Sequence, residues 1–144
     1  MIIIKEIDDN INKDEYCQLL KNLTTINSDN IDLDIFKNQI NIIKSNPYHK
    51  IYLAYDDNKI IGSITVIIEP KIIHDISFVS HIEDVVVDNN YQGKGIGRKL
   101  IEYAIDISKS YKCYKIILDC DKDKTKFYEK NGFKIKGNEM AIYF

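Results

Sequence analysis

The stretch YQGKGIGRKL, residues 91–100, decides the fold of this sequence because it joins a glycine loop to a helical pattern. Its glycines stand at every second position: Gly93, Gly95 and Gly97. From Arg98 onward the apolar residues recur at helical spacing, and before the loop the segment HIEDVVVD at 81–88 has the composition of a strand. The chain therefore runs from strand to glycine loop to helix, the order in which α/β sheets bind ligands at the carboxyl ends of their strands.

The rest of the sequence predicts further strands and helices. Apolar residues at i, i+3, i+4 and i+7 indicate helices, whereas alternation bounded by turn formers indicates strands. We expect strands or hairpins at 2–7, 50–70, 81–88, 114–120 and 133–144, helices at 12–23, 32–45, 95–110 and 123–131, and a connector of mixed character at 71–80. This order predicts an α/β fold with a mixed central sheet, as one domain over residues 1–144.

Charge and cysteine content exclude several classes of function. The chain has 20 basic and 22 acidic residues, so it lacks the field that gathers nucleic acid or an anionic membrane, and we expect neither as a partner. The apolar run at 2–4 is too short for a signal peptide or a membrane span, which predicts a cytoplasmic protein. Cys17, Cys113 and Cys120 lack metal-finger spacing, which favours free thiols and no bound metal.

Three phosphate-binding designs compete for the glycine loop. A P-loop is excluded because Lys94 is followed by Gly95 rather than by Ser or Thr. A dinucleotide fingerprint needs G-x-G-x-x-G, whereas this loop reads G-x-G-x-G and comes late in a short chain. The third design is Q-x-x-G-x-G at Gln92, Gly95 and Gly97, whose backbone N–H groups and helix amino end would bind a pyrophosphate. A glycine turn without a ligand stays open as the alternative.

Two adjacent acids lie within the strand before the loop. Glu83 and Asp84 would point to opposite faces of a regular strand, and the valines at 85–87 indicate that both faces are covered. A β-bulge would relieve the burial of one carboxylate and would splay this strand from its neighbour, opening room for a ligand. Asp119 ends the following strand at the same edge. Several acids facing one cleft suit an amine substrate, with solvated acids on an exposed strand as the alternative.

The segment HIEDVVVDNNYQGKGIGRKLIEYA, residues 81–104, resembles the donor-binding motif of the GNAT N-acetyltransferases, and FYEKNGF at 127–133 fits the same family. The resemblance implies a mixed sheet with a splayed strand pair and helices on both faces. It also implies that the loop holds the pyrophosphate of acetyl-CoA, while backbone groups of Val85 and Val87 pair with the pantetheine arm like an added strand. The cofactor-binding residues implied in this way are Val85, Val86, Val87, Gln92, Gly93, Lys94, Gly95, Ile96, Gly97, Arg98 and Tyr128.

Within that superfamily the chain more closely resembles the glucosamine 6-phosphate N-acetyltransferases. The blocks that carry this resemblance are LTTI at 23–26, EPKIIHD at 69–75, HIEDVVVDNNYQGKGIGRKLI at 81–101 and CYKIILDCDKDKTKFYEKNGF at 113–133. The resemblance implies acetyl transfer to the 2-amino group of glucosamine 6-phosphate, toward UDP-N-acetylglucosamine, by a homodimer whose site is completed across two chains. The substrate-binding residues it implies are Thr24, Lys71, Ile72, Ile73, His74, Glu83, Asp84 and Asp119.

For the chemistry, the resemblance makes Tyr128 the partner of the departing CoA thiolate. A phenol with an ordinary pKa of about 10 meets this modest demand. The residues themselves favour direct attack of the amine on the thioester, with Glu83 or the region of Asp119 accepting the proton, so that no covalent enzyme intermediate is needed. These three residues are the predicted catalytic residues. The family usually has a basic residue near its carboxyl terminus, where this chain has Tyr143.

Two other functions stay open from the sequence. One is a GNAT acetyltransferase for another amine, such as a polyamine or a peptide. Lys71 and His74 speak against it, because a cation and a second donor three positions apart suit a phosphate. The other is a noncatalytic acyl-CoA-binding module, against which the presence of Tyr128, Glu83 and Asp84 in one chain counts.

Overall fold

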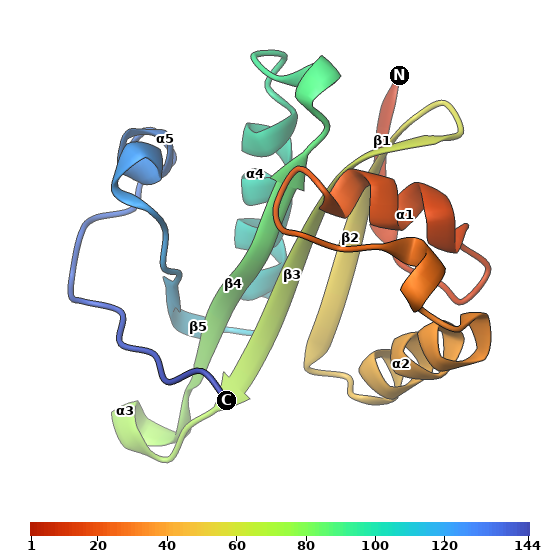
Figure 1. Cartoon of the computed structure of the whole chain (residues 1–144). Helices are drawn as coiled ribbons and strands as arrows, with labels where there is room; N and C mark the ends of the chain where they lie inside the picture. The colour runs from red at the N-terminus through yellow and green to blue at the C-terminus, as the bar shows by residue number, and fades with distance from the viewer.

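The computed structural model covers residues 1–144 and forms an open five-stranded sheet with helices on both of its faces (Figure 1). The strands are β1 Ile2–Glu6, β2 His49–Asp56, β3 Lys59–Pro70, β4 Phe78–Val87 and β5 Cys113–Ile117. The helices are α1 Lys13–Leu20, α2 Leu33–Ser45, α3 Ile73–Ile76, α4 Ile96–Ser110 and α5 Thr125–Lys130, with 3-10 turns at Ser28–Asn30, Asn89–Tyr91 and Lys122–Lys124.

The strands lie in the sheet in chain order, from β1 to β5. The first four pair antiparallel, and the connection between β1 and β2 contains α1 and α2, whereas β5 pairs parallel with β4 because the chain crosses over through α4. The predicted α/β fold with a mixed sheet is therefore confirmed. The crossover also places the glycine loop at the carboxyl end of β4, the expected position for a ligand site.

Helices α1 and α2 cover one face of the sheet. The cluster they form with β2, β3, β4 and the residue after β1 is Ile7, Tyr16, Leu19, Ile40, Ile51, Leu53, Ile60 and Val86. Both helices begin where the sequence offers a cap. Asn12 Oδ1 accepts from the Glu15 N–H, and Asp32 Oδ1 accepts from the N–H groups of Asp34 and Ile35. These caps satisfy N–H groups that the first turn of a helix leaves without acceptors.

Helix α4 covers the other face. Its core side chains, each at most 3% exposed, are Ile96, Leu100, Ile101 and Ala104. They pack on the strand residues Tyr52, Ala54, Ile61, Ile64, Val66, Ile68 and Ile82. Burying an aliphatic side chain of this size stabilises the fold by roughly 1.5–3 kcal/mol. The amino end of α4, and with it the glycine loop, is therefore fixed against the centre of the sheet.

The sheet is irregular where β4 approaches the glycine loop. The residue pairs that flank the irregularity are Ser63–Val86 and Thr65–Glu83. Between them β4 holds one residue more than β3, and this bulge contains Asp84 at a φ of 51°. Parallel pairing between β4 and β5 ends at His81, so the rest of β4 diverges from β5. The predicted bulge and the splayed strand pair are both present.

Three sequence predictions differ from the structure. The strand expected at 114–120 ends at Ile117, where its pairing with β4 ends. The closing strand or hairpin at 133–144 is wrong for this chain, because no residue after Lys130 belongs to a helix or strand. A strand needs a neighbour for its backbone hydrogen bonds, and no edge of the sheet pairs with this segment. The connector at 71–80 is shorter than predicted, because Phe78–Ser80 pair with Ile68–Pro70 and so begin β4.

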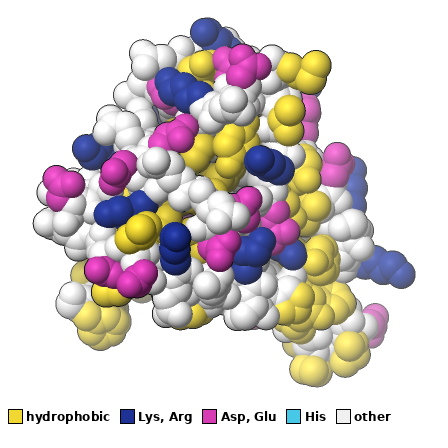
Figure 2. All heavy atoms as spheres, turned by 90° about the vertical axis from the view of Figure 1, so that its right-hand side faces the viewer, with side chains coloured by type: hydrophobic (Ala, Val, Ile, Leu, Met, Phe, Trp, Pro, Cys, Tyr) yellow, Lys and Arg dark blue, Asp and Glu magenta, His cyan; other side chains and the backbone are white.

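One face of the molecule carries charges of both signs side by side. On the face shown in Figure 2, Lys and Arg side chains are interspersed with Asp and Glu, and neither sign forms an extended patch. No helix combines the length and the apolar character needed to cross a membrane.

Candidate active site

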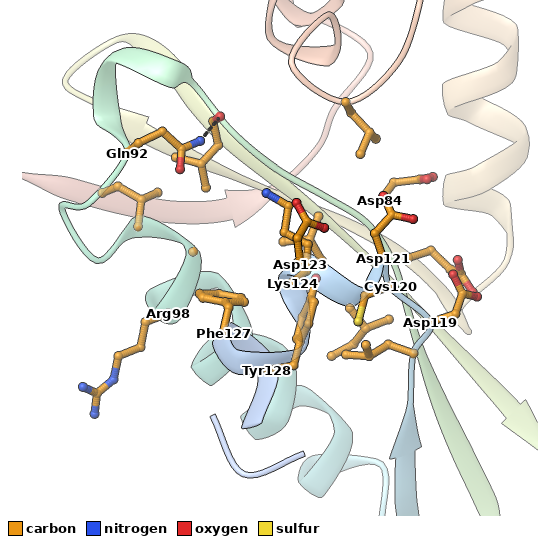
Figure 3. Close-up of a pocket in the computed structure, with 18 of the residues that line it drawn as sticks. Asp84, Gln92, Arg98, Asp119, Cys120, Asp121, Asp123, Lys124, Phe127 and Tyr128 are labelled. Carbon is orange, nitrogen blue, oxygen red and sulfur yellow. Dashed lines mark hydrogen bonds between the residues drawn. The ribbon is translucent and has the colours of Figure 1, made fainter. Parts of the chain in front are cut away.

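A cleft of about 710 Å³ opens between β4, the amino end of α4 and the segment that leads from β5 into α5 (Figure 3). The predicted site residues that line it are Glu83, Asp84, Val85, Val87, Gln92, Gly93, Gly95, Ile96, Gly97, Arg98, Asp119 and Tyr128. The structure thus brings the predicted donor loop, the acids and the tyrosine into one cavity. The splay of β4 from β5 provides the room, because a regular parallel pair would close this space.

The glycine loop leaves N–H groups free at the amino end of α4. Gly93 and Gly95 have φ of 75° and 79°, which favour glycine, and Gly95 caps the helix without a side chain. The Lys99 N–H donates to Gly95 O at 3.1 Å, so the three N–H groups between them have no helical acceptor. Gln92 Nε2 donates to Val87 O at 3.1 Å and stabilises the loop (Figure 3). Free N–H groups at a helix amino end are suited to binding a phosphate.

The basic side chains of the loop have partners of their own. Arg98 Nε lies 2.8 Å from Glu102 Oε1, and the arginine extends away from the other labelled residues (Figure 3). Lys94 Nζ lies 4.9 Å from the ring centroid of Tyr91 and does not line the cleft. In this conformation the phosphate-binding capacity of the loop rests on backbone N–H groups rather than on these two cations.

Six carboxylates line the cleft from three segments. Glu83 and Asp84 belong to β4, Asp119, Asp121 and Asp123 lie between β5 and α5, and Glu139 comes from the carboxyl-terminal segment. Burial raises the pKa of Glu83, and the negative charges of Asp119 and Asp84 raise it further. A carboxylate with a raised pKa takes up a proton more readily than an ordinary one. The cluster is therefore suited both to attracting a cationic amine and to accepting its proton.

Tyr128 lies on α5 and lines the cleft. Its ring packs edge-on against Phe127 and Phe133, with ring centroids 5.0 and 5.9 Å apart. Burial raises the pKa of Tyr128 to about 12, with smaller contributions from Cys120 and Asp119. The ordinary pKa expected from the sequence is therefore wrong for this phenol, because the cleft wall removes it from water. The hydroxyl stays protonated at physiological pH and is a hydrogen-bond donor.

Four predicted substrate-binding residues lie outside this cleft: Lys71, Ile72, Ile73 and His74. They form the tip of the β3–β4 hairpin around α3, at the opposite end of β4 from the glycine loop (Figure 1). Lys71 Nζ lies 3.0 Å from Glu69 Oε2, and the ring of His74 lies over that of Tyr114 with centroids 4.2 Å apart. Within one chain these residues do not meet the cleft acids, and their role in substrate binding stays a prediction.

Two more predicted residues do not line the cleft. Thr24 is exposed and directly follows Leu23, which does line the cleft, so Thr24 stands at the rim. Val86 is 5% exposed, and its side chain belongs to the core under α1 and α2, because it lies just beyond the bulge. Val85 and Val87, whose backbones were expected to pair with the donor, both line the cleft. The side chain of Val86 therefore contributes to the core rather than to the cleft.

The sequence did not predict several residues that line the cleft: Leu23, Ile82, Tyr91, Leu118, Cys120, Asp121, Asp123, Lys124, Phe127 and Glu139. The sequence did contain a signal for Phe127, because this residue precedes Tyr128 within the motif FYEKNGF at 127–133. A β-carbon on Gly97 would lie 3.0 Å from Phe127 Cζ, so a larger residue there would require the ring to shift. The sequence contained no such signal for Glu139, because the strand predicted for its segment at 133–144 is not formed and implied no contact with the cleft.

Comparison with known proteins relates the chain to acetyltransferases. The profile of the Acetyltransferase (GNAT) family matches residues 14–133. A glucosamine 6-phosphate N-acetyltransferase of Dictyostelium discoideum is 48% identical over 86 residues, which cover 60% of this chain and 55% of that protein. One of Candida albicans is 34% identical over 132 residues, which cover 90% of this chain and 87% of that protein. The crystal structure of glucosamine-6-phosphate N-acetyltransferase from Arabidopsis thaliana is 33% identical, with a TM-score of 0.93 and coverage of 100% of this chain and 99% of that one.

The family match includes every segment that forms the walls of the cleft from β4 to α5. The match to the Dictyostelium protein spans only about half of that protein, whereas the match to the Arabidopsis structure spans the whole fold. The fold of the whole chain is thus similar to that of a solved acetyltransferase. The chain belongs to the GNAT family of acetyltransferases.

Proposed function

We propose that this chain transfers the acetyl group of acetyl-CoA to the 2-amino group of D-glucosamine 6-phosphate. The observation that carries the proposal is the similarity to a glucosamine 6-phosphate N-acetyltransferase over 90% of the chain. The cleft supports it, because the donor loop and the group of carboxylates lie on its walls together. Carboxylates attract the ammonium form of an amine acceptor and can take its proton.

The donor half of the site is the glycine loop together with the end of β4. The pyrophosphate of acetyl-CoA would bind the free N–H groups at the amino end of α4. The pantetheine arm carries amides, and Val85 and Val87 lie where β4 has no partner on β5. Those amides would bond to β4 as an added strand does. With the pyrophosphate at the glycine loop and the pantetheine arm along β4, the thioester end of acetyl-CoA would lie near Glu83 and Tyr128.

The reaction needs no covalent enzyme intermediate. Glu83 accepts a proton from the sugar ammonium, and the free amine attacks the thioester carbonyl to form the C–N bond. The C–S bond then breaks, and the nitrogen of the new amide loses its second proton to solvent. Tyr128 donates a hydrogen bond to the leaving thiolate. Full proton transfer from a phenol of pKa about 12 to a thiolate whose thiol has a pKa of about 8.5 is unfavourable. Tyr128 therefore stabilises the thiolate charge without losing its proton, and the thiolate takes its proton from solvent after release.

The protein is proposed to act as a homodimer, with the β3–β4 hairpin tip of one chain completing the cleft of the other. In support, Lys71 and His74 lie outside the cleft of their own chain, although a cation and a ring N–H donor suit the sugar phosphate. The large apolar side chains exposed at this tip, at β5 and in the carboxyl-terminal segment are Ile72, Ile73, Ile76, Tyr114, Ile117, Ile135, Met140, Ile142, Tyr143 and Phe144. Exposed apolar surface of this extent is typical of an interface.

We also propose that the protein is cytoplasmic and that its product leads toward UDP-N-acetylglucosamine. The three cysteines are free thiols, which suits a reducing compartment. The product, N-acetylglucosamine 6-phosphate, carries the acetamido group that the nucleotide sugar needs.

The test is the release of CoA thiol in a panel of amine acceptors. We expect glucosamine 6-phosphate to be acetylated with a kcat/KM at least tenfold above that of unphosphorylated glucosamine, a polyamine or a peptide amine, because phosphate contacts add binding energy. A higher kcat/KM for one of the other amines would reject glucosamine 6-phosphate as the acceptor but would still support an acetyltransferase. Tight acetyl-CoA binding without acetylation of any amine would reject the enzyme.

A further inference from the structure

Helix α1 is joined to β3 by two side-chain hydrogen bonds, one at each irregularity of that strand. Glu15 Oε1 accepts from the Ile60 N–H at 2.8 Å, beside the register shift between β2 and β3. Tyr16 Oη and Ser63 Oγ lie 3.0 Å apart, beside the register shift between β3 and β4. Two consecutive residues of one helix thus bond to both places where the sheet departs from regular pairing.

The bond between Tyr16 and Ser63 is buried, with the two residues only 8% and 1% exposed. Neither of them lines the cleft. Burial raises the pKa of the Tyr16 phenol, the bond to Ser63 opposes this rise, and the nearby charge of Asp84 adds to it. The hydroxyl is placed at the bulge by its bond to Ser63, because Ser63 pairs with Val86 directly beside the register shift that contains Asp84.

The same helix also leads into the opposite rim of the cleft. Leu23, shortly after the end of α1, lines the cleft, and Thr24 stands beside it. Asn22 Oδ1 accepts from the Asn89 N–H at 3.2 Å, which ties this turn to the start of the donor loop. A shift of α1 along β3 would therefore move the Leu23 turn and the Asp84 bulge relative to each other.

We propose that Tyr16 is a positioning residue for the acceptor half of the cleft. Its hydrogen bond to Ser63 fixes α1 at the bulge and so sets the distance between the Leu23–Thr24 turn and Asp84. The inference rests on the proposed function for the identity of the acceptor, glucosamine 6-phosphate. The donor half is held mainly by the packing of α4, and its one side-chain hydrogen bond to the turn after α1 is the exposed bond from Asn89, so it should depend much less on Tyr16.

The test uses the full chain and three variants: Tyr16→Phe, Ser63→Ala and the two together. Each single variant leaves one buried hydroxyl without a partner, whereas the double variant removes both, so the double should recover most of the melting temperature that the singles lose. We expect all three to raise KM for glucosamine 6-phosphate by about fivefold, the factor that one neutral hydrogen bond is worth. KM for acetyl-CoA should stay within about twofold of wild type. Recovery of acceptor KM in the double variant, alongside its stability, would overturn the inference.

A matched control is Ser108→Ala. Ser108 Oγ donates to Ser80 Oγ at 2.7 Å, and this buried pair joins α4 to β4 without lining the cleft. Its loss should lower the melting temperature and leave both KM values unchanged. A raised acceptor KM in this control would mean that any buried hydroxyl pair has the same effect, and would refute a specific role for Tyr16.

Hydrogen exchange of the unliganded protein gives a readout that does not depend on turnover. In Tyr16→Phe and in the double variant, exchange should rise several-fold at residues 20–26 and 82–88, and in Ser108→Ala it should not rise there. Unchanged exchange in these two segments overturns the inference whatever the acceptor is. If the wild-type protein does not acetylate glucosamine 6-phosphate but exchange still rises in the two Tyr16 variants, the inference is supported and only the proposed acceptor is rejected.

Discussion

Gly97 and Phe127 are in contact across the donor side of the cleft: a β-carbon on Gly97 would lie 3.0 Å from Cζ and 3.3 Å from Cε1 of Phe127. Gly97 lies in the first turn of α4, and Phe127 lies in α5 beside Tyr128. A β-carbon at this position is disfavoured by an aromatic ring from another segment rather than by the backbone angles of Gly97. The donor loop and the helix that carries Tyr128 are therefore coupled through this contact.

Gly97→Ala should weaken donor binding. The added methyl displaces Phe127 and the α5 helix, and overpacking of this kind costs about 1–3 kcal/mol. We expect a lower melting temperature and a KM for acetyl-CoA raised by about tenfold. Gly137→Ala is the control, because nothing lies within 4 Å of a β-carbon there and that variant should match wild type. A wild-type donor KM in Gly97→Ala would contradict the coupling.

Tyr128→Phe should lower kcat by about 10²-fold, the usual contribution of one hydrogen-bond donor to a developing anion. KM for the acceptor should change little, because the hydroxyl acts only as the thiolate forms. Since the pKa of Tyr128 is about 12, wild-type kcat should not fall between pH 7 and about pH 10. Tyr103→Phe, on α4 outside the cleft, is the control. A fall in wild-type kcat near pH 9 that Tyr128→Phe abolishes would show that the phenol titrates in that range.

Glu83→Gln should raise the melting temperature at pH 7 while reducing activity. The pKa of Glu83 is raised in the folded protein, so the folded state binds its proton more tightly than the unfolded state does. The ionised form therefore destabilises the fold above the ordinary carboxyl pKa of about 4.3, and a neutral glutamine removes that cost. The difference in melting temperature should disappear as the pH falls below about 4.

Glu69→Gln is a control in which the melting temperature should change in the opposite direction. Hydrogen bonds from His81 and Lys71 lower the pKa of Glu69, so its ionised form stabilises the fold above its unfolded pKa. This variant should melt at a lower temperature than wild type at pH 7. If both variants change the melting temperature in the same direction, the burial argument for Glu83 is incorrect.

Ile72→Asp should dissociate the proposed dimer. The side chain is 82% exposed in the single chain, so a carboxylate there costs nothing in the monomer but would be buried in an interface. Light scattering should report a dimer for wild type and a monomer for the variant, with loss of acetylation. Ile35→Asp, at a side chain 68% exposed on α2, should remain dimeric and active. A monomeric, active wild-type protein would refute the dimer.

Lys71→Met should affect only the phosphorylated acceptor. If Lys71 binds the phosphate, its loss should raise KM for glucosamine 6-phosphate by about tenfold or more, in the range of one charge-assisted hydrogen bond. The slow rate with unphosphorylated glucosamine should not change. Equal effects on the two sugars would assign Lys71 to the structure of the hairpin tip, through its ion pair with Glu69.

Local sequence explains why the donor side of the site is predictable. The position of Gly95 at the start of α4 and the hydrogen bond of Gln92 depend on neighbours within a few residues. The bulge at Asp84 follows from local sequence as well, because two adjacent acids among valines cannot both avoid the core on a regular strand. Backbone conformation and strand alternation are encoded within such short windows.

Long-range packing explains what the sequence does not predict. The raised pKa of Tyr128 depends on burial that only the assembled cleft creates. The position of Phe127 depends on Gly97, which is distant in the chain. The apolar residues at 133–144 have the composition of a strand, but this segment pairs with neither edge strand of the sheet, and pairing is decided by residues distant in the chain.

The one-sided pairing of β4 beyond His81 has a consequence for the amount of active protein. If the pantetheine arm bonds to that open edge, the donor completes the sheet and binds only the folded state. Binding at a hundred times Kd would then stabilise the fold by about 2.7 kcal/mol. When acetyl-CoA is scarce, a larger fraction of the molecules would be unfolded and open to proteolysis, so the lifetime of the enzyme would follow the supply of its own substrate.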